Sequence, residues 1–105
     1  MMLTEPELRD LGVEITSSDL VEIQTVMGFC FVNVSKADGL QRRWHFRKSL
    51  ESEKYEPLRV WNLSNAERRI IVKQMDEAGI TRGLICNFLG VASTVVAYDL
   101  KVSRQ

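Results

Sequence analysis

The sequence predicts a mainly α-helical protein, with an N-terminal helical region over residues 1–57 and a three-helix domain over residues 58–105. Two observations predict this class. Apolar residues recur at helical intervals between Leu20 and Val34. Glycines at positions 79 and 90 then separate three further helical segments. A chain of 105 residues with 45% hydrophobic residues can bury a core without disulfide bonds.

The first element is a short helix that begins near Thr4 and ends at Gly12. Thr4 is a suitable N-cap, and Pro6 and Glu7 suit the first turn. The acidic, polar character of residues 1–12 is not that of a secretory signal peptide. We therefore expect a cytoplasmic protein.

A longer helix is expected from about residue 18 to residue 35. Asp19 and Glu22 have the spacing of an acidic variant of the capping box. Such a helix would carry more apolar surface than one small partner helix covers, so we expect it to join two copies in a homodimer. Its apolar positions are Leu20, Ile23, Val26, Met27, Cys30, Phe31 and Val34.

A β-hairpin is the alternative for this region, and the choice between helix and hairpin stays open. Gly28–Ser35 is rich in β-forming residues, and Lys36–Gly39 has the composition of a turn. Residues 40–46 then alternate between apolar and basic side chains, as in a strand. The alternation, however, puts Arg42 on the face that should be apolar. We therefore favour a second helix after the turn, capped by Asp38.

The C-terminal region begins after a charged loop at residues 51–57. Ser64 and Glu67 form a capping box, and Gly79 is a natural helix stop. Thr81 is placed to cap the next helix. The side chains expected to be buried in the first of these helices are Ile70, Ile71, Met75 and Ala78.

The last two helices are joined at Gly90, where the turn needs a residue that tolerates positive φ. Cys86, four residues earlier, supplies the small side chain that this kind of packing requires. The side chains expected to face inward are Ile85, Phe88, Leu89, Val91, Val96 and Leu100.

The stretch LGVASTVVAYDL and the helices before it resemble the helix-turn-helix of resolvases, invertases and transposases, whose consensus runs roughly IAxxLGVSRSTVYRYL. The resemblance covers about the last 40 residues. It implies a sequence-specific DNA-binding transcriptional regulator of bacterial or phage type, with its third helix in the major groove. The positions that fit without a gap are Leu89, Gly90, Val91, Thr94, Val96 and Leu100.

The third helix departs from this family at its reading positions. Ser93 and Tyr98 replace basic residues, and Asp99 adds a negative charge near the expected phosphates. Arginine, lysine, asparagine and glutamine read bases best, so we expect a weak reader that acts as a dimer on two half-sites. The candidate contacts are Ser93 and Thr94 to bases or phosphates, Val95 to a thymine methyl, Tyr98 to a phosphate, and Arg82, Lys101 and Arg104 as an electrostatic clamp.

A second candidate contact is the segment Gln41–Lys48, which interleaves cations with aromatic residues as nucleic-acid backbones prefer. On a helix, Arg43 and Arg47 would share a face beside Arg42 and reach flanking phosphates. The alternative is that Trp44 and Phe46 pack in a core, and we favour this for the two aromatic residues.

Charge leaves two functions open. The net charge is zero, but residues 1–35 carry −5, residues 36–57 carry +2 and residues 58–105 carry +3. This mild asymmetry permits a DNA-facing side. The neutral total and the arginine-free third helix instead favour a protein-interaction module that modulates another transcription factor without reading DNA.

Other functional classes lack their motifs. GxSxG, P-loop, GxGxxG and HExxH patterns are missing, so we expect neither an enzyme nor a cofactor. One histidine and no CxxC pair argue against a metal site, and Cys30 and Cys86 read as buried thiols. The apolar runs are shorter than the ~20 residues that span a bilayer, so we expect no membrane partner.

Overall fold

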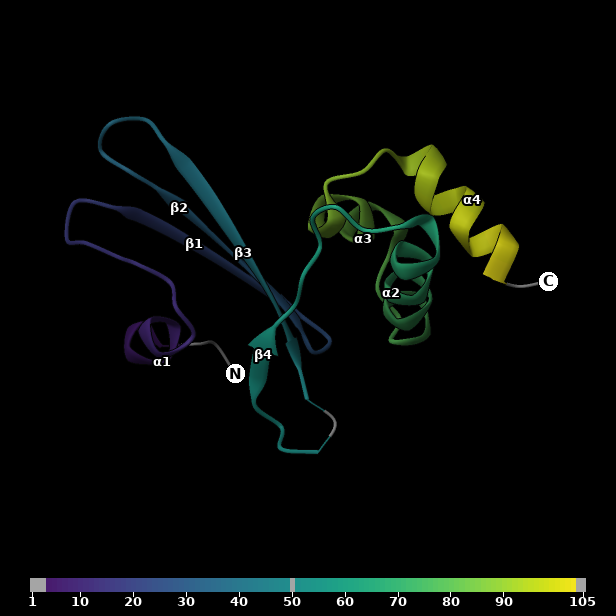
Figure 1. Ribbon diagram of the computed structural model, residues 1–105, viewed down its shortest axis with the longest axis horizontal. Coiled ribbons are helices and arrows are strands. Elements are labelled where there is room, and N and C mark those ends of the chain that lie inside the picture. The colour runs from purple at the N-terminus through teal and green to yellow at the C-terminus, as the bar shows by residue number, and fades with distance from the viewer. Residues whose placement is uncertain (1–3, 50, 104–105) are drawn as a thin grey trace. The chain divides into compact units, whose positions relative to one another are not determined.

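The structure of the protein is a computed structural model that describes residues 4–49 and 51–103. The chain divides into two compact units, Met1–Leu58 and Arg59–Gln105 (Figure 1). We refer to them as the N-terminal unit and the C-terminal unit. The boundary predicted from the sequence lies one residue earlier, between residues 57 and 58.

The N-terminal unit contains one helix and an antiparallel sheet (Figure 1). The strands stand in the order β1-β2-β3-β4, so every strand lies beside its neighbour in the sequence. The elements are α1 (Glu5–Asp10), β1 (Leu20–Val26), β2 (Phe29–Ser35), β3 (Gln41–Lys48) and β4 (Tyr55–Pro57).

The prediction of a mainly α-helical fold is therefore wrong. The residues expected to form a helix over 18–35 form β1 and β2, which pair from Leu20↔Ser35 to Val26↔Phe29. The cause lies in β2, where Phe29–Val32 and Val34 are all buried. A strand that is buried on both faces shows no alternation of polar and apolar residues, so its apolar positions also fit helical spacing.

The turn between β1 and β2 is the second cause of that error. Met27 and Gly28 both have positive φ, 47° and 85°, which is the type I′ conformation that suits the twist of a two-residue hairpin. This turn usually begins with asparagine or aspartate. A methionine in that place conceals the signal.

The helix expected beyond Asp38 is also wrong, and the hairpin alternative is correct there. The three-residue loop 37–39 ends at Gly39, whose φ is 91°, and the Lys36 N–H donates to the Leu40 carbonyl at 2.7 Å. Exposure falls along β3 from Arg42 to Phe46, so the charge at Arg42 lies at the exposed end of the strand.

Part of the loop predicted at residues 51–57 is strand β4. It pairs with the end of β3 through Phe46↔Pro57, Arg47↔Glu56 and Lys48↔Tyr55. Arg47 thus stands opposite a carboxylate across the strands, an arrangement that favours pairing.

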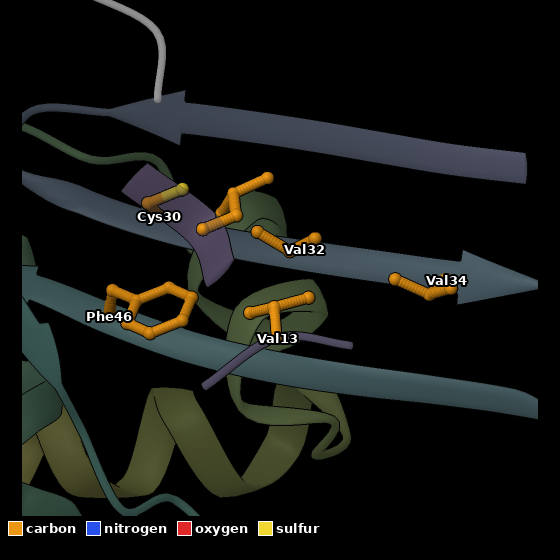
Figure 2. Close-up of a cluster of buried hydrophobic side chains, with 6 residues drawn as sticks. Val13, Cys30, Val32, Val34 and Phe46 are labelled. Atoms are coloured by element: carbon orange, nitrogen blue, oxygen red, sulfur yellow. The ribbon is translucent and has the colours of Figure 1, made fainter. Parts of the chain in front are cut away.

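The core of the N-terminal unit lies between α1 and one face of the sheet. Figure 2 shows Cys30, Val32, Val34 and Phe46 from the strands beside Val13. Leu8 of α1 belongs to the same buried cluster, and Trp44 packs against it. The prediction that Trp44 and Phe46 serve packing is confirmed. Thr4 caps α1 as expected, because its hydroxyl accepts from the Glu7 N–H.

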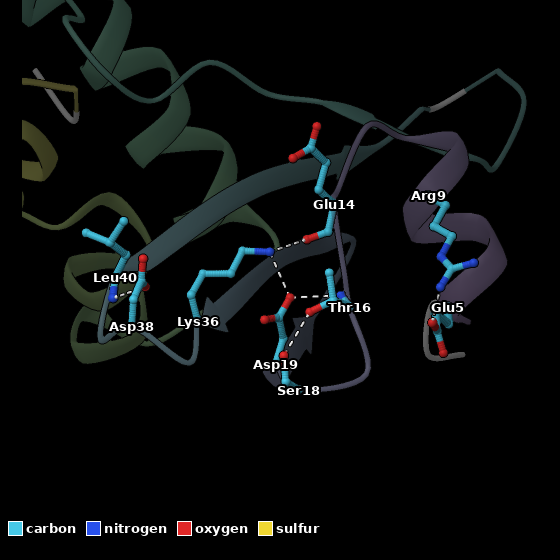
Figure 3. Close-up of polar contacts among 9 residues, drawn as sticks. All are labelled: Glu5, Arg9, Glu14, Thr16, Ser18, Asp19, Lys36, Asp38 and Leu40. Atoms are coloured by element: carbon cyan, nitrogen blue, oxygen red, sulfur yellow. Dashed lines mark hydrogen bonds and ion pairs between the residues drawn. The ribbon is translucent and has the colours of Figure 1, made fainter.

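A lysine ties the segment before β1 to the end of β2. Lys36 Nζ donates to Asp19 Oδ2 at 2.7 Å and to the Glu14 carbonyl at 3.1 Å (Figure 3). Asp19 Oδ2 also accepts from the Thr16 N–H at 2.8 Å. Asp19 therefore stabilises the loop before β1 and does not cap the helix that was predicted there. The hydrogen bond from Lys36 lowers the pKa of the Asp19 carboxyl.

The C-terminal unit is helical, as the sequence predicts for this part of the chain. It contains α2 (Asn65–Glu77), α3 (Arg82–Leu89) and α4 (Ser93–Ser103). Ser64 and Glu67 form the predicted capping box. The prediction that Ile70 is buried is wrong, because its side chain is exposed. In the described residues of this unit, the buried apolar side chains are Val60, Ile71, Val72, Met75, Ile80, Ile85, Phe88, Leu89, Val96 and Leu100.

Candidate nucleic-acid interface

The connection between α3 and α4 is short and sharply bent. Gly90 ends α3 with φ 68° and ψ 34°, and its N–H donates to the Cys86 carbonyl at 2.8 Å. Only Val91 and Ala92 separate Gly90 from α4. The two helices are bent by 113° at this break. Helix pairs that bind the major groove cross at about 90–120° after a turn of three or four residues.

The exposed side of α4 carries the predicted contact residues. Val96, Asp99 and Leu100 face the core. Thr94, Tyr98 and Lys101 are exposed, and their spacing of four and three residues puts them on one face of the helix. Ser93 is exposed at the first position of α4.

The remaining C-terminal candidates differ in their exposure. Arg82 is exposed at the start of α3. Val95 is half-buried, so only part of its side chain reaches the surface of α4. Arg104 lies outside the residues that the structure describes. The surface available on α4 is therefore made by two hydroxyl residues, a tyrosine and a lysine.

Asp99 points away from this surface, which corrects the expectation that its charge lies near bound phosphates. Its side chain is fully buried, and Arg68 of α2 donates hydrogen bonds to both of its carboxylate oxygens. Arg68 Nε donates to Oδ2 at 2.6 Å and Nη2 donates to Oδ1 at 2.9 Å. Arg69 Nε adds a third bond to Oδ1 at 3.1 Å. The exposed surface of α4 therefore carries no acidic side chain, because its one acidic residue, Asp99, is buried.

This network also determines the charge state of the carboxyl. The hydrogen bond from Arg68 holds the pKa of Asp99 below its usual value, against the opposing effect of burial, and Arg69 adds to the lowering. The same bond raises the pKa of the Arg68 guanidinium. A buried charge is tolerated only when it is paired and hydrogen-bonded, and Asp99 meets both conditions.

A cation–π contact joins α2 to the exposed face of α4. The Arg69 guanidinium lies over the ring of Tyr98, 5.3 Å from its centre. Tyr98 remains exposed, so the contact orients the ring and leaves its edge open to solvent. Sequence reasoning missed Arg68 and Arg69 because Asp99 lies 31 and 30 positions further along the chain. No short-range spacing rule connects them.

The arginines of the second candidate segment belong to the N-terminal unit and lie on strand β3. Arg43 and Arg47 still share a face, because side chains alternate along a strand. Arg42 lies on the opposite face, so the predicted helical grouping of the three is wrong. Arg43 is half-buried, donates from Nε to Asn33 Oδ1 at 2.6 Å and covers the Phe31 ring at 4.5 Å. It acts in the structure as a packing residue, while Arg42 and Arg47 are exposed.

Within residues 4–49 and 51–103, no group of three or more histidine, cysteine, aspartate or glutamate side chains is arranged to hold a metal ion. Cys30 and Cys86 are free thiols, and burial raises the pKa of Cys30. In the described part of the chain, no single helix is long and apolar enough to cross a membrane. Only α3 and α4 together reach that length and composition, across their bend.

Comparisons of this chain with protein-family models, with curated proteins and with solved structures found no match.

Proposed function

We propose that the protein is a sequence-specific DNA-binding transcriptional regulator of bacterial or phage type that acts in the cytoplasm, with α4 in the major groove. The observation that carries the proposal is the pairing of α3 and α4, bent by 113° across a glycine turn, with Thr94, Tyr98 and Lys101 on the outward face of α4. The bend lies within the range for helix pairs that read DNA.

The chemistry of this face favours phosphates over bases. Ser93, Thr94 and the Tyr98 hydroxyl donate hydrogen bonds to phosphate oxygens, and Lys101 and Arg82 supply positive charge. The burial of the Asp99 carboxylate supports the proposal, because an exposed aspartate on α4 would repel the DNA phosphates. With few direct base contacts, we expect modest affinity that falls steeply as salt rises.

The experiment first selects bound duplexes from a random pool and then titrates salt against the selected sequence. We expect binding at low salt and a linear fall of log affinity with log salt. The combined variant Ser93→Ala, Thr94→Ala and Tyr98→Phe should abolish selective binding while the circular-dichroism melt stays unchanged. Absence of binding at low salt, or full selectivity in the triple variant, contradicts the proposal.

A matched pair of lysines separates a specific contact from general charge. Lys101→Gln should weaken binding and reduce the salt slope by about 1, as expected for the loss of one phosphate contact. Lys73→Gln removes the same charge from an exposed position on α2, where Lys73 lies 3.9 Å from Glu77. This control should leave the slope unchanged. Equal effects of the two changes would mean that α4 has no special role.

The second candidate function is a protein-interaction module that modulates another regulator. Two exposed apolar side chains of the C-terminal unit, Trp61 and Ile70, favour it. Tryptophan is among the residues enriched where protein interfaces gain most of their binding energy. In that case Ile70→Ser should weaken capture of the partner, and the triple variant on α4 should leave that capture intact.

A further inference from the structure

The outer edge of β1 provides a surface for pairing with another strand. In the described residues, β1 has a strand neighbour only on its β2 side. Val26 and Phe29 close a two-residue turn and therefore form a hydrogen-bonded pair. It follows that Val21, Ile23 and Thr25 direct their backbone N–H and C=O groups to the outer edge.

This edge carries few of the features that usually block pairing. Strand β1 reads LVEIQTV, with one charge, Glu22, and no proline. Leu20 and Val21 are exposed, Leu20 by 76%. Edge strands with few charges and no proline are open to the addition of another strand. At the opposite end of the sheet, β4 has only three residues. The part of β3 that β4 does not cover carries Arg42 and Arg43, which would meet like charges in a self-pairing.

We propose that β1 pairs antiparallel with β1 of a second copy about a two-fold axis at Ile23, which joins two sheets into one. This register uses all seven residues of the strand. It places Glu22 opposite Gln24 of the second copy, and Leu20 opposite Val26. An axis at Glu22 would oppose two carboxylates, and axes nearer the strand ends shorten the overlap. Separation of the two Glu22 carboxylates and full overlap of the strands therefore both select this register for a second copy of this chain.

The pairing would also extend the hydrophobic core. Ile23 packs against the buried cluster beneath α1. At the two-fold axis its side chain meets Ile23 of the second copy on that same face of the sheet. The two cores thereby become continuous. The inference deepens the proposed function, because two copies provide the two reading helices that a weak single reader needs.

Analytical ultracentrifugation of the full chain without DNA tests the pairing. We expect a dimer in the wild type. Gln24→Glu places carboxylates opposite each other twice across the axis and should raise the dimer dissociation constant about tenfold. Adding Glu22→Lys to Gln24→Glu creates two opposite-charge pairs in the same register. This double variant should return the dissociation constant to the wild-type value or below.

Each other outcome overturns the inference. A wild type that stays monomeric across the concentration series excludes the dimer. A dimer that is indifferent to Gln24→Glu uses another surface. A dimer weakened by Gln24→Glu but not restored by Glu22→Lys has another register. Because no DNA is present, a dimer without DNA binding would reject only the proposed function, and DNA binding by a monomer would reject only the pairing.

Discussion

The carboxylate of Asp99 is buried although it lies on α4, the helix that we propose to bind DNA. It receives hydrogen bonds from Arg68 and Arg69 of α2, and Arg69 in turn covers the exposed ring of Tyr98. One network therefore fixes the position of α4 against α2 and orients a residue of the outward face. Its loss should affect both the stability of the C-terminal unit and the geometry of that face.

We expect Asp99→Asn to destabilise the C-terminal unit by about 3 kcal/mol, since Arg68 would lose its buried partner. The value is at the low end for such pairs because Arg68 keeps some contact with solvent. Chemical denaturation followed by the helical circular-dichroism signal measures it. Glu77→Gln is the control, since this exposed carboxylate should change stability by less than about 1 kcal/mol. Equal losses of stability in Asp99→Asn and Glu77→Gln would show that the buried Asp99 network stabilises the unit no more than an exposed carboxylate does.

The same residue gives a pH dependence. The pKa of Asp99 is lower in the folded chain than in the unfolded chain. The stabilisation is therefore complete above the ordinary aspartate pKa of about 3.9 and is lost as the pH falls through the folded pKa. The wild type should lose stability below about pH 4 in a pH series of denaturation curves, and Asp99→Asn should lose less over that range.

At the scale of elements, the helices of the C-terminal unit were predicted from the sequence, whereas the hairpin strands were only the less favoured alternative. Ser64, Glu67, Gly79 and Gly90 are local signals, and each acts within one turn of its own helix. The strands depend on contacts between distant segments. Strand β2 is buried on both faces, so its composition carries no period. The contact that buries Asp99 is equally non-local, and no spacing within the sequence indicates it.

The β1–β2 turn supplies a stability prediction at this scale. Met27 adopts φ 47° at a position that favours asparagine, and its side chain is exposed. Met27→Asn should stabilise the N-terminal unit by about 1 kcal/mol because asparagine tolerates this conformation better. Denaturation followed by Trp44 fluorescence in a Trp61→Phe background measures the change.

Met27→Val is the opposite control, because a β-branched residue is strained at positive φ and should destabilise the same transition. Stabilisation by valine and loss by asparagine would contradict the type I′ assignment.

At the scale of the whole molecule, each unit has its own task in this account. The N-terminal unit offers an open strand edge for a second copy, and the C-terminal unit offers α4 to DNA. The sequence predicted two parts and a dimer in the first, but it assigned the dimer to a helix that does not exist. The proposed dimer instead uses strand β1. The β1–β2 turn determines which backbone groups of β1 face outward, and the single charge and the length of the strand select the register.

Chemical-shift mapping of the isotope-labelled full chain against the selected duplex tests the central claim, that α4 reads DNA, most directly. The account predicts that the largest amide shifts fall on Ser93, Thr94, Tyr98 and Lys101, with smaller shifts at Arg82. It predicts little change at Ile70. The largest shifts around Ile70, with α4 unmoved, would contradict the account, because DNA would then contact α2 and not α4.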